Sequence, residues 1–282
     1  MSSSWASFLQ AFSTPWLDQL MYLITSMGSE TFYMVVLPVL YWTWNKRAGY
    51  RMVVFYLFGA YTNSVLKLAF HTPRPTPTPA ARVMHAETGP GYSFPSGHAQ
   101  GATAFWGQQA LEVRTKTAWA VAVLMIFLIS LSRVYLNVHW PVDVAGGILI
   151  GMALLAVLNW LSGLWDRLDP PTGVRLLLCA ASAVAMYLVY HLEDAHILVG
   201  FLFGFPAGRI LEESYVGWNE QASFRANVLK VAVGLAGLLA FRYGLKLALP
   251  DTASGDILRY AIAGLWGSLG APLVFVKMGW CK

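Results

Sequence analysis

The stretch from Thr117 to Trp165, TAWAVAVLMIFLISLSRVYLNVHWPVDVAGGILIGMALLAVLNWLSGLW, carries the clearest structural signal in the chain. It contains two blocks without Lys, Arg, Asp or Glu, 117–132 and 144–165, separated by a short polar segment, 133–143. A lipid bilayer core needs about 20 largely apolar residues per helix, so blocks of this length predict two membrane-spanning helices. The polar segment then falls at a membrane edge, where one helix ends and the next begins.

The rest of the chain repeats this pattern. Of its 282 residues, 57% are hydrophobic and 12% are charged, whereas soluble domains contain about a quarter charged residues. A soluble fold would have to bury all these apolar helices in one core, so we predict an all-α, polytopic transmembrane helical bundle. The other charge-free blocks are 31–45, 52–66, 176–191 and 260–276. The expected helices span 31–45, 50–70, 98–113, 117–137, 141–165, 174–191, 195–211, 227–248 and 258–278.

Two further features concern the first residues and the net charge. The segment 16–27 is short and contains Asp18, so it predicts either a tilted or an interfacial first helix.

The net charge of +5 is not arranged as a basic stripe with an aromatic platform, and we therefore expect no nucleic-acid partner.

Basic residues cluster in alternate loops, which predicts the orientation of the helices. Loops rich in Lys and Arg stay in the cytoplasm, and this places the polar segments 67–74, 95–98 and 133–143 together on the non-cytoplasmic face. Arg242, Lys246 and Arg259 fall on the opposite side in this scheme. The clusters that define the cytoplasmic face are Lys46, Arg47 and Arg51; Arg114 and Lys116; Arg167 and Arg175; and Lys277 and Lys282.

The three polar segments contain the candidate functional residues. They are Lys67-Leu-Ala-Phe-His-Thr-Pro-Arg74-Pro75, Pro95-Ser-Gly-His98 and Ser132-Arg-Val-Tyr-Leu-Asn-Val-His139-Trp-Pro-Val-Asp143. Charged groups persist at a membrane edge where they pair with one another, with water or with an anion. Fixed cations and the free N–H groups at a helix start both favour phosphate oxygens. We therefore expect phosphate to be bound by Lys67, Arg74, Ser96, Gly97 and Arg133.

Two histidines and one carboxylate complete the set. His139 and Asp143 are four residues apart at the start of a helix that Pro141 opens, so their side chains can meet. A carboxylate on one imidazole nitrogen leaves the other nitrogen free to attack phosphorus. His98, on another helix, is the candidate general acid for the leaving group and the later general base. Taken singly, each residue has a structural alternative, and the conjunction favours one catalytic site without a metal ion.

Other features leave alternatives open. The proline-rich segment 72–96 predicts a lid over the site or a plain connector, and we favour the lid. The glycine pair at 147 and 151 and the row at 200, 204 and 208 predict close helix packing within the chain, with a homodimer interface as the alternative. The run His191-Leu-Glu193-Asp194-Ala-His196 fits a solvated turn better than a metal site, because its spacing matches no standard site.

In residue type, order and spacing, the three polar segments resemble the signature motifs of the type 2 phosphatidic acid phosphatase (lipid phosphate phosphatase) superfamily. The resemblance covers 67–143 directly. It implies a six-helix core that ends near Trp165, a metal-independent reaction through a phosphohistidine and no cofactor. His139 would be the nucleophile, Asp143 its partner and His98 the acid. We accordingly expect a phosphatase core in 1–165 and a C-terminal extension of about four hydrophobic helices in 166–282.

The expected function is hydrolysis of a lipid phosphate. We expect an integral membrane enzyme, in a bacterial cytoplasmic membrane, that acts at the non-cytoplasmic face on a polyprenyl diphosphate or a phosphatidate-like lipid. Two alternatives remain, namely a phosphatase of soluble sugar phosphates or sphingoid phosphates, and a non-catalytic phospholipid-binding transporter or scaffold. The expected partners are the phosphorylated lipid and the bilayer, with a homodimer left open.

Overall fold

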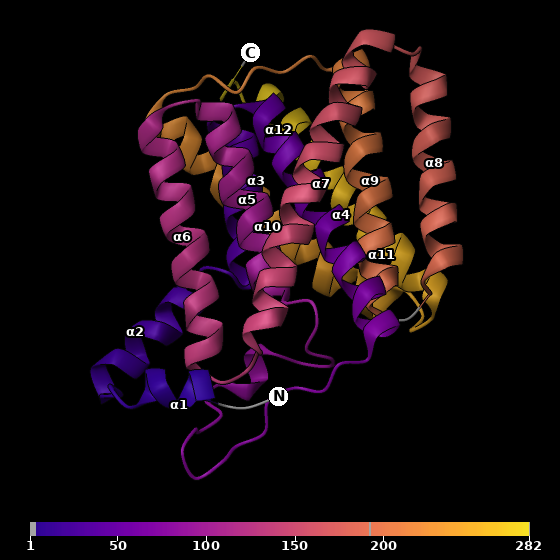
Figure 1. The fold of residues 1–282 in the computed structure, drawn as a ribbon. Helices are drawn as coiled ribbons and strands as arrows, with labels where there is room; N and C mark the ends of the chain where they lie inside the picture. The colour runs from indigo at the N-terminus through magenta and orange to yellow at the C-terminus, as the bar shows by residue number, and fades with distance from the viewer. Residues whose placement is uncertain (1–3, 192, 282) are drawn as a thin grey trace. The chain divides into compact units, whose positions relative to one another are not determined.

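The computed structural model describes residues 4–191 and 193–281, and the regular elements in these ranges are helices. Long helices follow one another through short connections, except for the irregular segment 71–96 (Figure 1), which contains a 3₁₀ turn, η1 (Ala86–Thr88). The α-helices are α1 (Ser4–Gln10), α2 (Pro15–Ser26), α3 (Glu30–Thr43), α4 (Lys46–Phe70), α5 (Gly97–Val113), α6 (Lys116–Tyr135), α7 (Pro141–Leu168), α8 (Thr172–Val189), α9 (Glu193–Tyr215), α10 (Phe224–Ala248), α11 (Ala253–Leu265) and α12 (Ala271–Lys277).

The helical transmembrane class predicted from the sequence is confirmed. Among the residues that the structure describes, seven helical segments are long and apolar enough to cross a membrane, and an eighth results if α2 and α3, bent by 50° at their junction, count as one span. The last predicted helix is interrupted by a π-helical turn, η2 (Trp266–Gly270), between α11 and α12. The seven segments are α4, α6, α7, α8, Ala195–Tyr215 of α9, α10 and Ala253–Lys277.

Contacts divide the chain into two compact units. Unit 1 combines Met1–Met34 with Thr62–Trp160, and unit 2 combines Val35–Tyr61 with Leu161–Lys282. All of the candidate site residues belong to unit 1. The predicted boundary between a phosphatase core and an extension at residue 165 stays a prediction.

Glycines set the spacing of the helices inside unit 1. A Cβ built on Gly147 would lie 2.6 Å from the carbonyl oxygen of Ser96, and one on Gly151 would lie 2.8 Å from the Cβ of Thr103. Real Cβ contacts are longer than this, so the backbone of α7 lies directly against α5 because these two residues have no side chain. The close approach places the start of α7 beside the start of α5.

In unit 2, the glycines at 200, 204 and 208 likewise allow two helices to pack closely. A Cβ on Gly200 would lie 2.6 Å from the carbonyl oxygen of Ile257, and one on Gly204 would collide with the backbone of Ala261, so α9 runs along α11. Both glycine rows therefore pack within the chain, as the sequence favoured.

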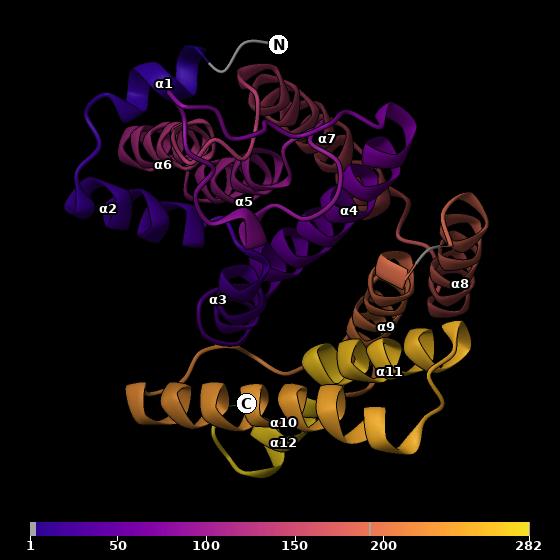
Figure 2. The same cartoon turned by 90° about the horizontal axis from the view of Figure 1, so that it is seen from below.

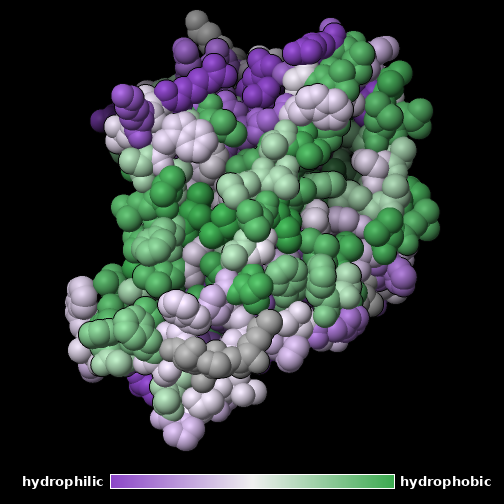
Figure 3. Space-filling model, in the orientation of Figure 1, coloured by the Kyte–Doolittle hydropathy of each residue, from purple (hydrophilic) through white to green (hydrophobic). Residues whose placement is uncertain are grey.

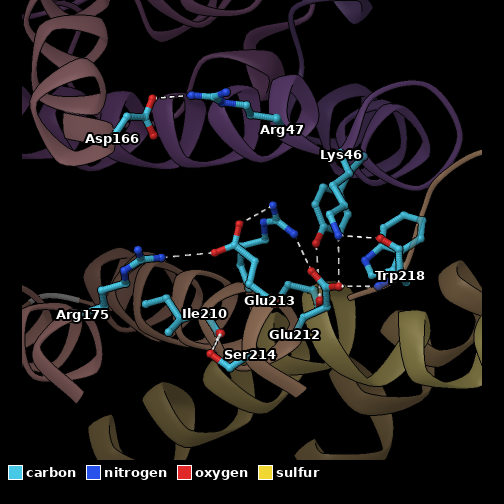
Figure 4. Close-up of polar contacts among 12 residues, drawn as sticks. Lys46, Arg47, Asp166, Arg175, Ile210, Glu212, Glu213, Ser214 and Trp218 are labelled. Carbon is cyan, nitrogen blue, oxygen red and sulfur yellow. Dashed lines mark hydrogen bonds and ion pairs between the residues drawn. The ribbon is translucent and has the colours of Figure 1, made fainter. Parts of the chain in front are cut away.

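Unit 2 also contains a buried ionic cluster around Glu212, whose side chain is fully buried (Figure 4). The Glu212 carboxylate accepts hydrogen bonds from Nζ of Lys46 at 3.1 Å, from the backbone N–H of Trp218 at 2.9 Å and from the Arg209 guanidinium. The neighbouring Glu213 pairs with Arg209 at 2.5 Å. Because each buried charge has an opposite partner, the cluster fixes α9 to the start of α4 and to the segment after α9.

The surface of α6 in unit 1 is apolar along its middle. Val121, Val123, Leu124 and Phe127 are exposed there. In Figure 3, this surface is green, and hydrophilic groups gather at the end where α6 begins. An apolar belt between polar ends is the surface expected of a helix in contact with lipid.

Candidate active site

The helix ends that carry the candidate residues lie together at one end of unit 1 (Figure 1). Lys67 lies in the last turn of α4, and Arg133 lies in the last turn of α6. His98 lies in the first turn of α5, and Asp143 lies in the first turn of α7. His139 occupies the short connection between α6 and α7. This arrangement follows because successive helices run in opposite directions, so that the ends of α4 and α6 lie beside the starts of α5 and α7.

His139 and Asp143 form the centre of the site, and both are buried. Nδ1 of His139 lies 3.4 Å from Oδ2 of Asp143. The same carboxylate oxygen accepts a hydrogen bond from the backbone N–H of Trp140 at 2.8 Å and another from the hydroxyl of Ser93. The Ser93 oxygen in turn lies 3.4 Å from Nδ1 of His139. Asp143 is therefore fixed by two donors besides the imidazole.

The contacts of His139 indicate which of its nitrogens carries the proton. Nε2 lies 3.2 Å from Nη1 of Arg74, which can only donate. Nε2 must then be the acceptor, which leaves the proton on Nδ1, where Asp143 can accept it. The lone pair of Nε2 consequently points toward the cationic side of the site, as a nucleophile for phosphorus requires.

Arg74 is held by backbone carbonyls of the proline-rich segment. Its Nε donates to Gly91 at 2.8 Å, and Nη2 donates to Pro90 at 2.8 Å and to Tyr92 at 3.0 Å. Nη1 donates to the carbonyl of Val138 at 2.6 Å. One guanidinium thus joins the segment 90–92 to the residue directly before His139. The proline-rich segment therefore contacts the site, and its role as a lid stays a prediction.

Arg133 is the second arginine of the site, and it is fully buried. Its Nη1 donates to the hydroxyls of Thr25 at 2.7 Å and Thr88 at 3.0 Å, and its Nη2 donates to the carbonyl of Thr88 at 2.9 Å. Gly89 lies between the two arginines, because a Cβ built there would lie 2.7 Å from Nη1 of Arg74 and 3.3 Å from Nη2 of Arg133. The two cationic groups therefore approach the same small region.

The second polar segment begins α5. Ser96 is the N-cap residue, and its backbone N–H donates to the carbonyl of Asp143 at 3.0 Å, which joins the starts of α5 and α7. Asn63 of α4 donates to the carbonyl of Pro95 at 3.2 Å and to Oε1 of Gln100 at 2.8 Å. These bonds fix the turn that presents Ser96 and Gly97. A free helix start of this kind attracts anions.

Burial and positive charge set the protonation of the site. Burial, followed by the charges of Arg133, Arg74 and Lys67, lowers the pKa of His139 well below its usual value, so its imidazole is neutral at neutral pH. Burial lowers the pKa of Arg74 to about 10, and Arg74 remains a cation at neutral pH. The candidate site thus combines a neutral imidazole with fixed positive charges.

Three buried polar atoms of the candidate residues have no hydrogen-bond partner among the described residues. They are the hydroxyl of Ser96, Nε of Arg133 and Oδ1 of Asp143. Buried polar atoms without partners are rare in folded proteins and concentrate at functional positions. Two of the three are donors on residues predicted to bind phosphate.

Sequence reasoning missed four supporting residues: Ser93, Asn63, Thr25 and Thr88. Ser93 stands two residues before Pro95, so its place in the motif segment was a usable signal. The other three are ordinary polar residues far from the motifs in sequence, and their role appears when the helices pack. For the run 191–196, Nε2 of His196 lies 3.1 Å from the carbonyl of His191, while the side chains of Glu193 and Asp194 lie outside the described structure.

Two protein-family models match the chain. The model described as "PAP2 superfamily" matches residues 48–167, which include all the candidate site residues. The model described as "PAP2 superfamily phosphatase, transmembrane extension" matches residues 197–282. The chain belongs to the PAP2 superfamily. It is an integral membrane protein in which the region that matches the superfamily model precedes the region that matches the transmembrane-extension model.

Several phosphatases are similar to parts of the chain. Sphingosine-1-phosphate phosphatase 2 of Mus musculus is 31% identical over 153 residues, which are 51% of this chain and 42% of the mouse protein. Phosphatidylglycerophosphatase B of Bacillus subtilis is 29% identical over 156 residues, 50% of this chain and 72% of that protein. The crystal structure of a transmembrane PAP2-type phosphatidylglycerolphosphate phosphatase from B. subtilis has 25% identity and a TM-score of 0.48, and covers 57% of this chain and 84% of that one. The chain thus spans less than half the length of the mouse relative.

Proposed function

We propose that this PAP2 protein is a membrane phosphatase that hydrolyses the phosphomonoester or diphosphate of a lipid at the non-cytoplasmic face. The observation that carries the proposal is the orientation of His139. Its Nε2 is an acceptor on the side of Arg74, and its Nδ1 faces Asp143. A neutral imidazole with its free lone pair directed at a cationic region is suited to attack a bound phosphate.

The reaction has two steps. In the first, Nε2 of His139 forms a bond to phosphorus while the bond from phosphorus to the leaving oxygen breaks, and His98 gives a proton to that oxygen. In the second, His98 takes a proton from water, the water oxygen bonds to phosphorus, and the bond between nitrogen and phosphorus breaks. Inorganic phosphate leaves, and both histidines return to their starting states. Asp143 stabilises the charge that His139 carries in between.

The remaining residues would bind and neutralise the phosphate group. Lys67, Arg74 and Arg133 supply fixed cations, and Ser96 with Gly97 supplies donors at the start of α5. We propose that these cations provide the charge neutralisation that a metal ion provides in other phosphatases, so that the reaction is metal-independent. We also propose that residues 1–165 carry out the reaction.

Two observations support a lipid substrate. The relatives that match this chain are named as phosphatases of sphingosine 1-phosphate and of phosphatidylglycerophosphate, both of which carry phosphate on a lipid. The candidate site lies at the end of helices whose middle is apolar, where the tail of a lipid can stay in the bilayer. We propose a lipid phosphomonoester as the first substrate class, with polyprenyl diphosphates as the second, in a bacterial cytoplasmic membrane.

A phosphate-release screen tests the proposal. The purified full chain is assayed on sphingoid phosphate, phosphatidate, phosphatidylglycerophosphate, polyprenyl diphosphate and a sugar phosphate, each with EDTA present. We expect release from at least one lipid and retention of that activity in EDTA. Release from the sugar phosphate alone would overturn the lipid assignment, and loss of activity in EDTA would overturn the metal-independent mechanism.

The nucleophile is tested separately. Rapid acid-free quenching with radiolabelled substrate should trap phosphate on the chain in the wild type and not in His139→Ala. The matched control is His191→Ala, which changes an exposed histidine of unit 2 and should behave as the wild type. Binding of lipid phosphate without any phosphate release in the wild type would instead favour a non-catalytic lipid-binding protein.

A further inference from the structure

The two N-terminal helices lie across the end of α6 where the candidate site is located. Figure 2 looks onto that end and shows α6 end-on between α1 and α2, which both run sideways; in Figure 1 the same helices lie at the lower end of α6. Both helices contact α6, and all three belong to unit 1. If α6 crosses the bilayer, α1 and α2 therefore lie near the plane of its surface.

The outer face of this pair is aromatic and uncharged. Trp5, Phe8, Phe12 and Trp16 are each more than 60% exposed, and Leu23 follows them on α2 with 56% exposed. This surface is green at the lower left of Figure 3. Trp and Phe at this density on one face are typical of helices that lie at the boundary between headgroups and acyl chains.

The inner face of the pair packs against the catalytic region. Leu9 of α1 and Leu17 and Met21 of α2 pack on a buried cluster formed by Tyr135, Leu136 and Val138, which ends directly before His139. Val83 and Met84 of the proline-rich segment pack on the same cluster. The two faces of the pair thus differ in composition, with the apolar outer face exposed and the inner face built into the fold.

Hydrogen bonds also join the pair to the site. The side chain of Gln10 donates to the carbonyls of Arg82 at 2.9 Å and Tyr135 at 2.7 Å, and accepts from the N–H of Arg82 at 2.9 Å. At the other end of α2, Thr25 accepts from the phosphate-binding candidate Arg133 at 2.7 Å. Gly28, just after α2, lies so close to His98 that a Cβ built there would be 3.0 Å from Cδ2 of that histidine.

We infer that α1 and α2 form an interfacial platform: the outer face binds the lipid surface at the boundary between headgroups and acyl chains, and the inner face holds the proline-rich segment and Arg133 at that depth. The occupant is lipid because the outer face lies next to the apolar surface of α6 and has the aromatic composition of a membrane boundary. The exposed residues of this face include no Lys or Arg, so binding does not require anionic lipid.

A depth measurement tests the position of the platform. In a Cys179→Ser, Cys281→Ser background, spin labels are placed through Phe12→Cys and Trp16→Cys, and the full chain is reconstituted in phosphatidylcholine vesicles. Thr78→Cys, on the exposed tip of the proline-rich segment, gives the reference in water, and Phe127→Cys, midway along α6, gives the reference in the acyl chains.

The expected accessibility to oxygen and to a water-soluble nickel chelate lies between the two references at both test positions. Accessibility equal to that of Thr78→Cys would mean that the face contacts water, and equality with Phe127→Cys would mean that the pair spans the bilayer. Spin–spin coupling that rises with protein density would mean that a second copy covers the face. Each of these three results would overturn the inference.

A kinetic measurement tests the consequence and rests on the proposed function. In Phe8→Gln/Phe12→Gln/Trp16→Gln, the loss of three apolar contacts should raise the KM for a lipid phosphate in vesicles by about tenfold or more. The kcat on a short-chain, water-soluble ester should remain within about twofold, because none of these side chains touches the candidate site. The matched control Phe8→Trp/Phe12→Trp should keep the wild-type KM.

The depth measurement and the kinetic measurement distinguish a failure of the platform from a failure of the proposed function. If the wild type releases no phosphate from any ester, the proposed function is wrong while the depth measurement still decides the platform. If instead the lipid and the soluble ester are affected equally by the triple substitution, the platform is wrong while the phosphatase proposal stands.

Discussion

The replacement Arg74→Lys keeps the positive charge beside His139 and removes the geometry that the guanidinium provides. Arg74 donates to four backbone carbonyls, three of them in the segment 90–92, and it also contacts Nε2 of His139. A lysine ammonium is a point charge with three donors on a flexible stem, and it cannot reach carbonyls on both sides of the site at once.

The size of the effect follows from these bonds. We expect about three hydrogen bonds to be lost, each with a value of about 1.5–3 kcal/mol when one partner is charged. The carbonyls of Gly91 and Pro90 are at the surface and regain bonds to water, so we reduce the figure to about 1 kcal/mol per bond, or about 3 kcal/mol in all. This free energy keeps the segment 90–92 bound to Arg74, and its loss corresponds to about a hundredfold change in the population of molecules in which the segment contacts the site.

The assay is kcat/KM for phosphate release together with limited proteolysis of the proline-rich segment. We expect Arg74→Lys to lower kcat/KM by about a hundredfold and to speed cleavage within 76–92. Arg82→Lys is the matched control in the same segment, because Arg82 pairs with Ser13 and Asp18 away from the histidines, and it should stay within about threefold. Wild-type kcat/KM in Arg74→Lys would refute the reasoning.

Three further predictions rest on contacts in the two units. Because burial and the neighbouring cations lower the pKa of His139, its imidazole stays neutral as pH falls through about 6.5, where an unperturbed histidine gains its proton. The value of kcat/KM should therefore not fall near pH 6.5 through protonation of His139. At high pH, kcat/KM should fall as Arg74 loses its proton near a pKa of about 10. Ser93→Ala should lower kcat by about tenfold with little change in KM, because Asp143 loses one charge-assisted donor; an unchanged kcat in steady-state assays would contradict this role. Glu212→Gln should lower the thermal midpoint of the detergent-solubilised chain, with a destabilisation of about 3 kcal/mol, because Lys46 loses its buried carboxylate partner and Arg209 keeps only Glu213. The activity of this variant before heating should match the wild type.

Much of the fold was accessible from the sequence because membrane helices are set by local composition. The helices expected from the sequence match α3 to α10 to within a few residues, since lipid exposure requires apolar side chains whatever the neighbouring helix is. The short helix α1 and the π-helical turn η2 were not predicted, because their length and hydrogen bonding depend on packing. The grouping of Val35–Tyr61 with unit 2 is likewise a tertiary property.

In the candidate site, too, some residues could be predicted from local sequence and others depend on tertiary packing. His139, Asp143 and the arginines stand in motifs whose spacing reports their chemistry. Thr25 is different, because it accepts from Arg133 across 108 positions of sequence, and nothing near it in the chain marks it. Contacts of this kind arise from the packing of α2 on the end of α6, which no local pattern encodes.

Gly147 of α7 limits which substitutions the candidate site can tolerate. The start of α7 carries Asp143, the start of α5 carries His98, and Gly147 lets the two backbones meet at the carbonyl of Ser96. A single methyl group at position 147 would push apart the helix that carries Asp143 and the helix that carries His98. Displacements of about 1 Å are enough to cost a hundredfold in rate. The absence of a side chain at position 147 therefore sets the distance between the helix starts that carry Asp143 and His98, and a larger residue there should alter the candidate site without touching any of its polar groups.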